Sequence, residues 1–368
     1  MSTETLTPVL ETSNSAGALQ IELATPGDDQ ELRDLLHAMP MGERIQVKFL
    51  REPSFFAAAA IQGHRVQVIV GRKRGRIIGF GTRAIRRCYI NGQPTEAGYL
   101  ADLRLIASQR GGTALARGYR FLRRLHEENP VDVYSTVIVE DNQRAISTIA
   151  SGRAGLPAYA PMGRVLTPMI QLRGRRAKIS TEGEIRRGDI SLLPAIVERL
   201  NAERLQFAPA YTVDDFTGGR FPGFGVEDFY VLSRGDRIAA VAGAWDQQTL
   251  RQTVISGYGG WLNRLRPLCN LFRRPPLPSP GTTLRYFTVS FVAADDAPAL
   301  AALMRHIYND AVGGPWSHFT LALHEDDPRS AIFKAYRRDH FAGRLYAVMF
   351  DQSADLDGRV PYVDAGML

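Results

Sequence analysis

An internal repeat is the feature that most constrains the fold of this chain. Three short segments of the first half recur in the same order in the second half: Glu140–Ala145 as Glu325–Ser330, Ala114–Ala116 as Ala299–Ala301, and Arg76–Ile78 as Arg237–Ala239. The first two pairs are 185 residues apart and the third is 161 residues apart. Matches that occur in the same order in both halves, with a single change of spacing, indicate that one unit has been duplicated. The second copy then carries an insertion, for which the Arg-, Pro- and Leu-rich segment 261–280 is the obvious candidate.

Both copies show the same order of expected elements. In the first copy we predict a helix over 28–39, a hairpin over 66–70 and 77–86, a strand over 98–107, a helix over 113–128, a strand over 132–139 and a helix from 142. The apolar residues of 113–128 recur at helical spacing, and the hairpin segments are β-branched runs separated by a Gly-containing turn. Strands that alternate with helices predict an α/β or α+β fold.

The domain organisation follows from the repeat. A chain of 368 residues is long enough for two or three domains at roughly 150 residues each. We predict a disordered tail over 1–17, an N-terminal domain over 18–172, a polar basic linker over 173–181, a C-terminal domain over 182–352 and a tail over 353–368.

Composition excludes several classes of protein. Two cysteines cannot form a disulfide framework, and no run of about 18 apolar residues predicts a transmembrane helix. We therefore expect a cytoplasmic protein. A formal charge of +7 suits nucleic acid, an acidic membrane surface or phosphorylated ligands. The arginines are scattered among acidic residues and no RNA-binding signature is present, so we expect no nucleic-acid partner.

The segment 103–114 carries the strongest functional signal. A strand runs into a Gly-rich turn that opens a helix, with Arg110, Gly111 and Gly112 in the turn. Amides at a helix N-terminus are unpaired and favour an anion, and glycine permits close approach of the backbone. The turn thus predicts a pyrophosphate site, with an ordinary strand-to-helix connection and a solvated Arg110 as the alternative.

This segment resembles the acetyl-CoA loop of the GCN5-related N-acetyltransferase (GNAT) superfamily, whose pattern is Q/R-x-x-G-x-G/A. Gln109, Gly112 and Ala114 fill its three defining positions, and Asn142 with Ala145 resembles the N-x-x-A helix start that flanks CoA in the family. Arg110 also fits the first position in a second register. The resemblance covers about 18–172, and a weaker copy covers about 182–352. It implies two tandem acyl-CoA N-acyltransferase-type domains, each a mixed central sheet flanked by helices.

The resemblance also implies a site and a reaction. The sheet would splay at the strand ending near Leu105, with backbone groups of Leu103 and Leu105 facing the pantetheine arm. The implied cofactor-binding residues are completed by the loop and by the following helix start: Gln109, Arg110, Gly111, Gly112, Thr113, Ala114 and Asn142. An amine acceptor would attack the thioester of acetyl-CoA, or of a longer acyl-CoA, directly. The histidines show no metal-ligand spacing, so we expect no metal.

Two residues are candidates for proton transfer. Asp102 precedes the core of the implied splayed strand, where several family members carry a base, while pairing with Arg104 or another cation is its structural alternative. Glu96 is a weaker candidate. Many relatives place a tyrosine acid seven residues after the asparagine, but Ile149 stands there, so Tyr159 is the candidate acid.

The second copy lacks the loop chemistry. At the spacing of 185, the turn becomes Asp295-Asp296-Ala297-Pro298, which suits a helix cap and would repel pyrophosphate.

The segment 261–274 mixes arginine with large apolar residues and is a surface excursion, a lid over an acyl chain or a peripheral membrane contact. The sequence thus predicts an acyl-CoA-dependent N-acyltransferase, with a non-catalytic acyl-CoA-binding or sensing protein as the alternative.

Overall fold

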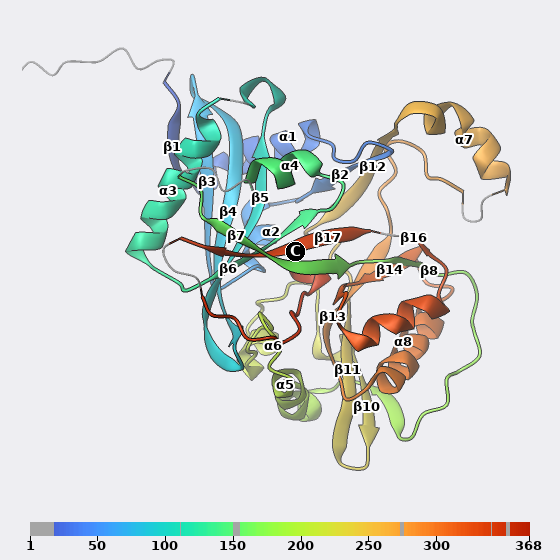
Figure 1. Cartoon of the computed structure of the whole chain (residues 1–368). Coiled ribbons are helices and arrows are strands. Elements are labelled where there is room, and N and C mark those ends of the chain that lie inside the picture. The colour runs from blue at the N-terminus through green and yellow to red at the C-terminus, as the bar shows by residue number, and fades with distance from the viewer. Residues whose placement is uncertain (1–17, 111, 150–154, 273–275, 340, 351–353) are drawn as a thin grey trace, which may run out of the picture.

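The chain forms two mixed β-sheets that meet in the middle of the molecule, with helices on their outer faces (Figure 1). The structure, a computed structural model, describes residues 18–110, 112–149, 155–272, 276–339, 341–350 and 354–368. The expected tail over 1–17 lies outside the described residues. The mixed α/β architecture expected from the repeat is confirmed.

The first sheet has eight strands, six from the first half of the chain and two from the second half. Their spatial order is β1 (Gln20–Leu23), β3 (Arg65–Lys73), β4 (Arg76–Ile90), β5 (Gln93–Leu105), β6 (Tyr134–Val139), β17 (Ala342–Met349), β7 (Ala158–Leu166) and β15 (Leu323–His324). The second sheet has seven, in the order β16 (Arg338–Asp339), β8 (Met169–Gln171), β14 (His318–Leu321), β13 (Tyr286–Ala294), β11 (Arg237–Trp245), β10 (Phe229–Arg234) and β9 (Glu184–Arg187).

The two sheets exchange strands. β17 belongs to the second half of the sequence but lies between β6 and β7 of the first sheet, while β8 of the first half pairs with β14 and β16 in the second sheet. The expected boundary at 173–181 therefore does not separate the two sheets. Hydrogen bonding between strand edges decides which strands are exchanged. No local pattern in the sequence indicates which distant strand will pair with a given edge.

The helices cover the sheets on both sides. Their bounds are α1 (Asp29–Ala38), α2 (Phe55–Ala60), α3 (Ala114–Glu128), α4 (Gln143–Ile149), α5 (Leu193–Ala202), α6 (Val213–Thr217), α7 (Gly260–Phe272) and α8 (Ala297–Ala311). In α3 the apolar stripe Tyr119, Leu122 and Leu125 is buried against the first sheet, as its helical spacing predicts. Among the described residues, no helix combines the length and apolarity needed to cross a bilayer.

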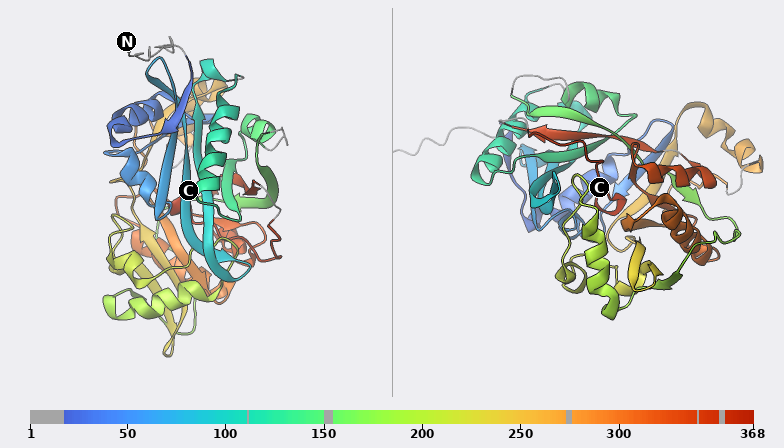
Figure 2. Two further views of the ribbon diagram at one scale, coloured as in Figure 1. Left: turned by 90° about the vertical axis from the view of Figure 1, so that its left-hand side faces the viewer. Right: turned by 60° about the horizontal axis from the view of Figure 1, so that its bottom comes forward.

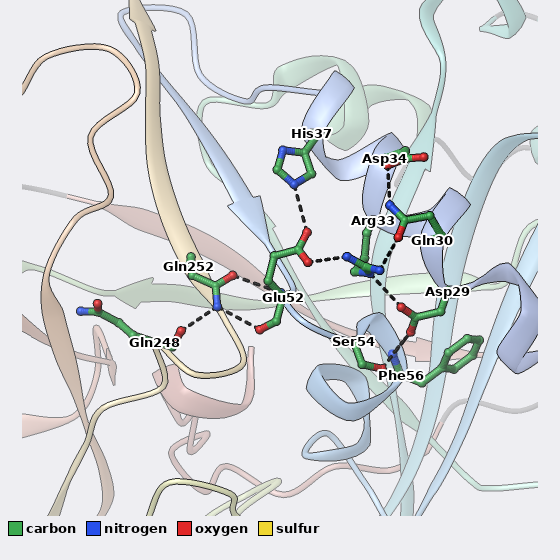
Figure 3. A network of polar contacts seen from close by, with 10 residues as sticks. All are labelled: Asp29, Gln30, Arg33, Asp34, His37, Glu52, Ser54, Phe56, Gln248 and Gln252. Carbon is green, nitrogen blue, oxygen red and sulfur yellow. Dashed lines mark hydrogen bonds and ion pairs between the residues drawn. The ribbon is translucent and has the colours of Figure 1, made fainter.

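A two-stranded ribbon joins the halves. β2 (Ile45–Leu50) pairs antiparallel with β12 (Gln252–Tyr258). A polar network extends this junction (Figure 3): the Glu52 amide donates to Gln252 Oε1 at 3.1 Å, and Gln252 Nε2 donates to the Glu52 carbonyl at 3.0 Å. The Glu52 carboxylate contacts Arg33 at 2.5 Å and His37 at 3.0 Å, both on α1. The Glu52–Gln252 hydrogen bonds thus link the two halves, and the ion pairs to α1 fix the position of Glu52.

The duplication is visible in the structure, with a correction to its alignment. The hairpins β3–β4 and β10–β11 keep the spacing of 161, since Arg76 and Arg237 both open the second strand. However, β5 ends at Leu105 and β13 at Ala294, a spacing of 189, whereas α3 and α8 begin at Ala114 and Ala297, a spacing of 183. The second copy therefore has a strand-to-helix connection six residues shorter, a difference that the uniform spacing of 185 concealed.

The end of the chain packs inside the molecule. Residues 354–368, part of the expected tail over 353–368, run past the second sheet, where Met367 is 1% exposed. Asp364 accepts hydrogen bonds from the amides of Phe291 and Gly366, each at 2.8 Å. Buried apolar residues among polar ones anchor this segment, whose one regular element is a short 3-10 helix over Ala365–Met367, so periodicity could not reveal it. Figure 2 shows the C-terminus at the centre of the molecule in both views.

Candidate functional site

β5 and β6 separate soon after they meet. The two parallel strands pair only at Gly98–Tyr134 and Tyr99–Ser135. Just beyond, the hydroxyl of Thr136 donates to the carbonyl of Leu100 at 2.7 Å, so a side chain replaces the backbone ladder. β5 nevertheless continues to Leu105. The splay that the sequence predicted at this strand is confirmed.

A β-bulge lies in the separated part of β5. Thr82 faces Ala101 and Phe80 faces Arg104, so Asp102 and Leu103 together lie opposite the single residue Gly81. Asp102 has a φ of 59°, in the left-handed region that few non-glycine residues adopt. A bulge leaves its extra residue outside the ladder. Backbone amides at this position are thus available for a ligand oxygen.

The loop after β5 ends at a helix without a side-chain cap. A short 3-10 helix over Ala107–Gln109 leads to Arg110, whose Nε donates to the Leu105 carbonyl at 3.1 Å. Thr113 occupies the N-cap of α3 but makes no side-chain cap hydrogen bond. The first amides of α3 therefore have no capping side chain to bind, which leaves them for an anion. Gly112 is exposed, and Gly111 lies outside the described residues.

A lysine that the sequence analysis did not single out approaches this loop. Lys73, at the end of β3, has its Nζ 3.4 Å from Gln109 Oε1. Gln109 and Arg110, expected to bind cofactor, thus lie beside a second cation.

An apolar cavity lies beside the bulge and the loop. It is a partly open hollow whose space, open solvent included, is about 700 Å³, and it is lined by β1, β3, β4, β5 and α3. Among its lining residues are Leu103, Leu105 and Ala114, which the sequence predicted to meet the cofactor, together with Leu100, Leu122 and Thr82. The structure therefore brings together the strand, the bulge and the helix start around one hollow.

A glycine in α3 helps to keep this cavity open. Gly118 lines the cavity, and a Cβ built on it would meet no atom within 4 Å. Glycine inside a helix costs about 1 kcal/mol relative to alanine. Although glycine is unfavourable inside a helix, the missing side chain at Gly118 leaves this part of the cavity open. An isolated glycine within a helical pattern was a signal that the sequence contained.

Asp102 is held by an ion pair on the other side of the bulge. Its carboxylate contacts Arg51 Nη2 at 2.5 Å and accepts from the Thr82 hydroxyl at 3.3 Å. Burial raises the pKa of Asp102, but the charges of Arg51, Arg104 and Arg251 outweigh burial and hold this pKa below its ordinary value. The cation expected as a structural partner is therefore present, and Arg51 rather than Arg104 forms the direct contact.

The arginines around Asp102 come from distant parts of the chain. Arg251 is buried, its pKa is lowered by burial to about 10, and it donates to the carbonyls of Ala58 and Leu368 at 3.1 and 2.6 Å. Arg51 Nη1 is buried and has no hydrogen-bond partner among the described residues. Neither arginine stands in a motif, so sequence reasoning had no signal for them. Glu96 pairs with His64 at 2.9 Å and is half exposed.

Tyr159 forms a hydroxyl pair with a residue of α3. Its oxygen lies 2.6 Å from the hydroxyl of Tyr119, which lines the cavity. Burial, together with Tyr119, raises the pKa of Tyr159 far above its ordinary value, and burial raises the pKa of Tyr119 to about 12. Both side chains are thus protonated at neutral pH. Ile149, which replaces the tyrosine of the family pattern, is buried in the core around α3.

Two other expectations concern helix starts. Asn142 caps α4, because its Oδ1 accepts from the Ala145 amide at 3.2 Å, and it does not line the cavity. In the second copy, Asp296 Oδ1 accepts from the Ala299 amide at 2.6 Å and Asp295 pairs with Arg237 at 2.6 Å. The expected capping role is confirmed for Asp296, whereas Asp295 forms ion pairs with Arg237 and Arg199. Among the described residues, no group of three or more metal-ligating side chains is gathered.

Comparison with solved structures identifies the architecture. The structure superposes on Saccharomyces cerevisiae N-myristoyltransferase with bound myristoyl-CoA with a TM-score of 0.59, at 12% identity, over 95% of this chain and 82% of that one. A second structure of that yeast enzyme with myristoyl-CoA gives a TM-score of 0.50 at 11% identity, over 88% and 86% of the chains. The chain has the GNAT fold.

A GCN5-related N-acetyltransferase from Anabaena variabilis is also similar, with a TM-score of 0.48 at 11% identity, over 89% of this chain and 72% of that one. No protein-family model matches the sequence, and no curated protein matches it. In the GNAT fold of this chain the splay, the bulge and the loop all belong to the first half. The second half repeats the strands and helices with a shortened loop.

Proposed function

We propose that the chain is an acyl-CoA-dependent N-acyltransferase whose first half binds the acyl-CoA and carries the reaction. The observation that supports this most is the apolar cavity, which adjoins both a strand bulge and an uncapped helix N-terminus. An acyl-CoA needs each of these features, because it combines a pyrophosphate, a thioester carbonyl and an apolar chain.

The loop binds the pyrophosphate in this proposal. The amides of Gly112, Thr113 and Ala114 face the phosphates, and the helix dipole favours their charge. Arg110 and Gln109 add side-chain donors, and Lys73 lies close enough to Gln109 to add a cation. Asn142 contributes by fixing the start of α4 beside the cofactor.

The donor carries an acyl chain longer than acetyl. An acetyl group has one methyl to place in apolar surroundings, whereas this hollow is lined by apolar side chains from several elements, among them Leu100, Leu103 and Leu122. Each methylene that leaves water contributes about 0.8 kcal/mol. The similar yeast enzyme was crystallised with myristoyl-CoA, which agrees with a chain-binding hollow in this fold.

Direct attack by the amine follows from the arrangement of polar groups. The neutral amine nitrogen attacks the thioester carbon, and amides at the Asp102 bulge stabilise the negative charge that develops on oxygen. The C–S bond breaks and the nitrogen loses a proton. Asp102 is a carboxylate at neutral pH, so it can accept that proton through water or stabilise the ammonium that forms. Its lowered pKa makes it a weak base. Tyr119 lines the cavity and Tyr159 is hydrogen-bonded to it, so this pair is the candidate proton donor to the leaving thiolate.

A reducing compartment such as the cytoplasm suits this protein, since Cys88 is a free thiol in the core. The acceptor in this proposal is an amine, and a screen of amines would identify it.

A non-catalytic acyl-CoA-binding module is the second candidate. It is favoured by Ile149 at the position of the family acid and by the ion pair that occupies Asp102. Two measurements separate the candidates. Native mass spectrometry of the purified protein should reveal a co-purified acyl-CoA and its chain length. A free-thiol assay with that acyl-CoA and a panel of amines should then show amine-dependent release of CoA. Binding without amine-dependent release from any amine would favour the binding module.

A further inference from the structure

One face of α7 contacts the protein through Arg266, Asn270 and Leu262. Asn270 Oδ1 accepts from the Leu277 amide at 2.7 Å, and Arg266 Nη2 donates to Ser279 at 2.9 Å. Leu262 is buried on the same side, against Tyr258 and Leu277. The returning segment 277–280 therefore covers one face of the helix.

The opposite face of α7 is apolar and exposed. Trp261, Leu265, Leu268 and Leu271 have exposed fractions of 57%, 44%, 55% and 67%. These positions recur at helical spacing and form one stripe. The stripe holds four of the eleven large apolar side chains that are exposed among the described residues. In Figure 1, α7 stands at the edge of the molecule beyond the end of β12. A helix that shows its apolar stripe to solvent has a binding partner elsewhere.

The charge around the stripe selects the class of partner. Residues 247–294 contain six arginines and no acidic residue, although 38 of the 368 residues are acidic and an even distribution would place about five in these 48. Arg264 is exposed within the stripe, and the Arg44 guanidinium lies over the Trp261 ring at 5.3 Å. The surface therefore combines apolar side chains with a local excess of arginine, to which Arg264 and Arg44 contribute.

We propose that the α7 stripe, defined by Trp261, Leu265, Leu268 and Leu271, docks on an anionic lipid surface. A cationic helix with tryptophan and leucine on its apolar face suits the interface of an acidic bilayer. The contact is peripheral, since α7 has 13 residues, far fewer than the ~20 that a span requires. A second copy of the chain fits less well, because an isologous contact would bring the arginines of both copies together. This inference is independent of the proposed acyl transfer.

Vesicle sedimentation of the whole protein tests the proposal. We expect binding to phosphatidylcholine vesicles that contain about one third phosphatidylglycerol, little binding to pure phosphatidylcholine, and release as salt rises toward ~0.5 M. The double variant Leu265→Glu/Leu268→Glu should lose at least about tenfold in affinity for the anionic vesicles. Both side chains are exposed, so the variant should fold, and its thermal melt checks this.

A matched control is available far from α7 in sequence. Ile190 and Val213 are 66% and 37% exposed, so Ile190→Glu/Val213→Glu adds the same two negative charges at similar exposures and should leave vesicle binding intact. Three results would overturn the proposal: no binding of the wild type, equal binding to neutral and anionic vesicles, or equal loss in the control and the double variant. A wild-type dimer that the double variant converts to monomer, without vesicle binding, would instead assign the stripe to a second copy.

Discussion

Replacing Gly118 by leucine tests whether the cavity beside α3 holds the acyl chain. Gly118 lies in the interior of α3 and lines the cavity, and a side chain there would enter open space. The substitution should not unfold the protein. Leucine has a higher helix propensity than glycine, so the free energy of unfolding should rise by up to about 0.8 kcal/mol.

The expected effect on binding depends on chain length. A leucine side chain adds four carbons, which would displace roughly three or four methylenes of a bound acyl chain. At about 0.8 kcal/mol for each methylene, the loss is about 3 kcal/mol. This corresponds to roughly 10²-fold in affinity for an acyl-CoA that fills the cavity. Acetyl-CoA has no methylene to displace, so its affinity should hardly change.

Calorimetric titration with a series of acyl-CoA thioesters, from acetyl to long-chain, measures this directly. Gly174→Leu is the matched control, because Gly174 also has open space around its Cβ but does not line the cavity. An unchanged preference for chain length in a folded Gly118→Leu protein would refute the assignment. An equal loss for every thioester and for free CoA would mean that the cavity holds the pantetheine arm.

Four further predictions concern the loop and the polar groups. Gly112→Asp should lower CoA affinity at least about tenfold, while Ala297→Asp at the matching helix start of the second half should leave it unchanged; calorimetry measures both. Asp102→Asn should lower turnover by roughly 10²-fold with acyl-CoA affinity unchanged, and full turnover with an unaltered pH–rate profile would exclude Asp102 from proton transfer. Because the folded-state pKa of Asp102 lies below its ordinary value, this carboxylate contributes stability above about pH 4 that is lost as pH falls through its folded pKa; the melting temperature of Asp102→Asn should therefore fall less steeply with acid than that of the wild type. Tyr159→Phe should cost about 1 kcal/mol of the free energy of unfolding and slow single-turnover acyl transfer, and an unaltered rate would remove its hydroxyl from the reaction.

The repeat and the strand–loop–helix pattern were accessible from the sequence because each depends on neighbouring residues. The apolar spacing in 113–128 predicted α3, and the Gly-rich turn at Gly112 predicted the helix start that follows it. The splay followed from the resemblance carried by Gln109, Gly112 and Ala114. Asp296 was recognised as a cap because a carboxylate before a helix has a strong local preference, whereas the ion pairs of Asp295 depend on distant arginines.

Only the tertiary structure decided how the two halves combine and what surrounds Asp102. β17 enters the first sheet from the far end of the chain, and Arg251 comes from the second half to share the environment of Asp102 with Arg51. The uniform repeat spacing failed between β13 and α8 because the connecting loop shortened while the elements on either side kept their order. Strand exchange and buried ion pairs depend on which distant segments meet. Local periodicity does not indicate which segments will pair, because an edge strand offers the same backbone donors and acceptors to any partner.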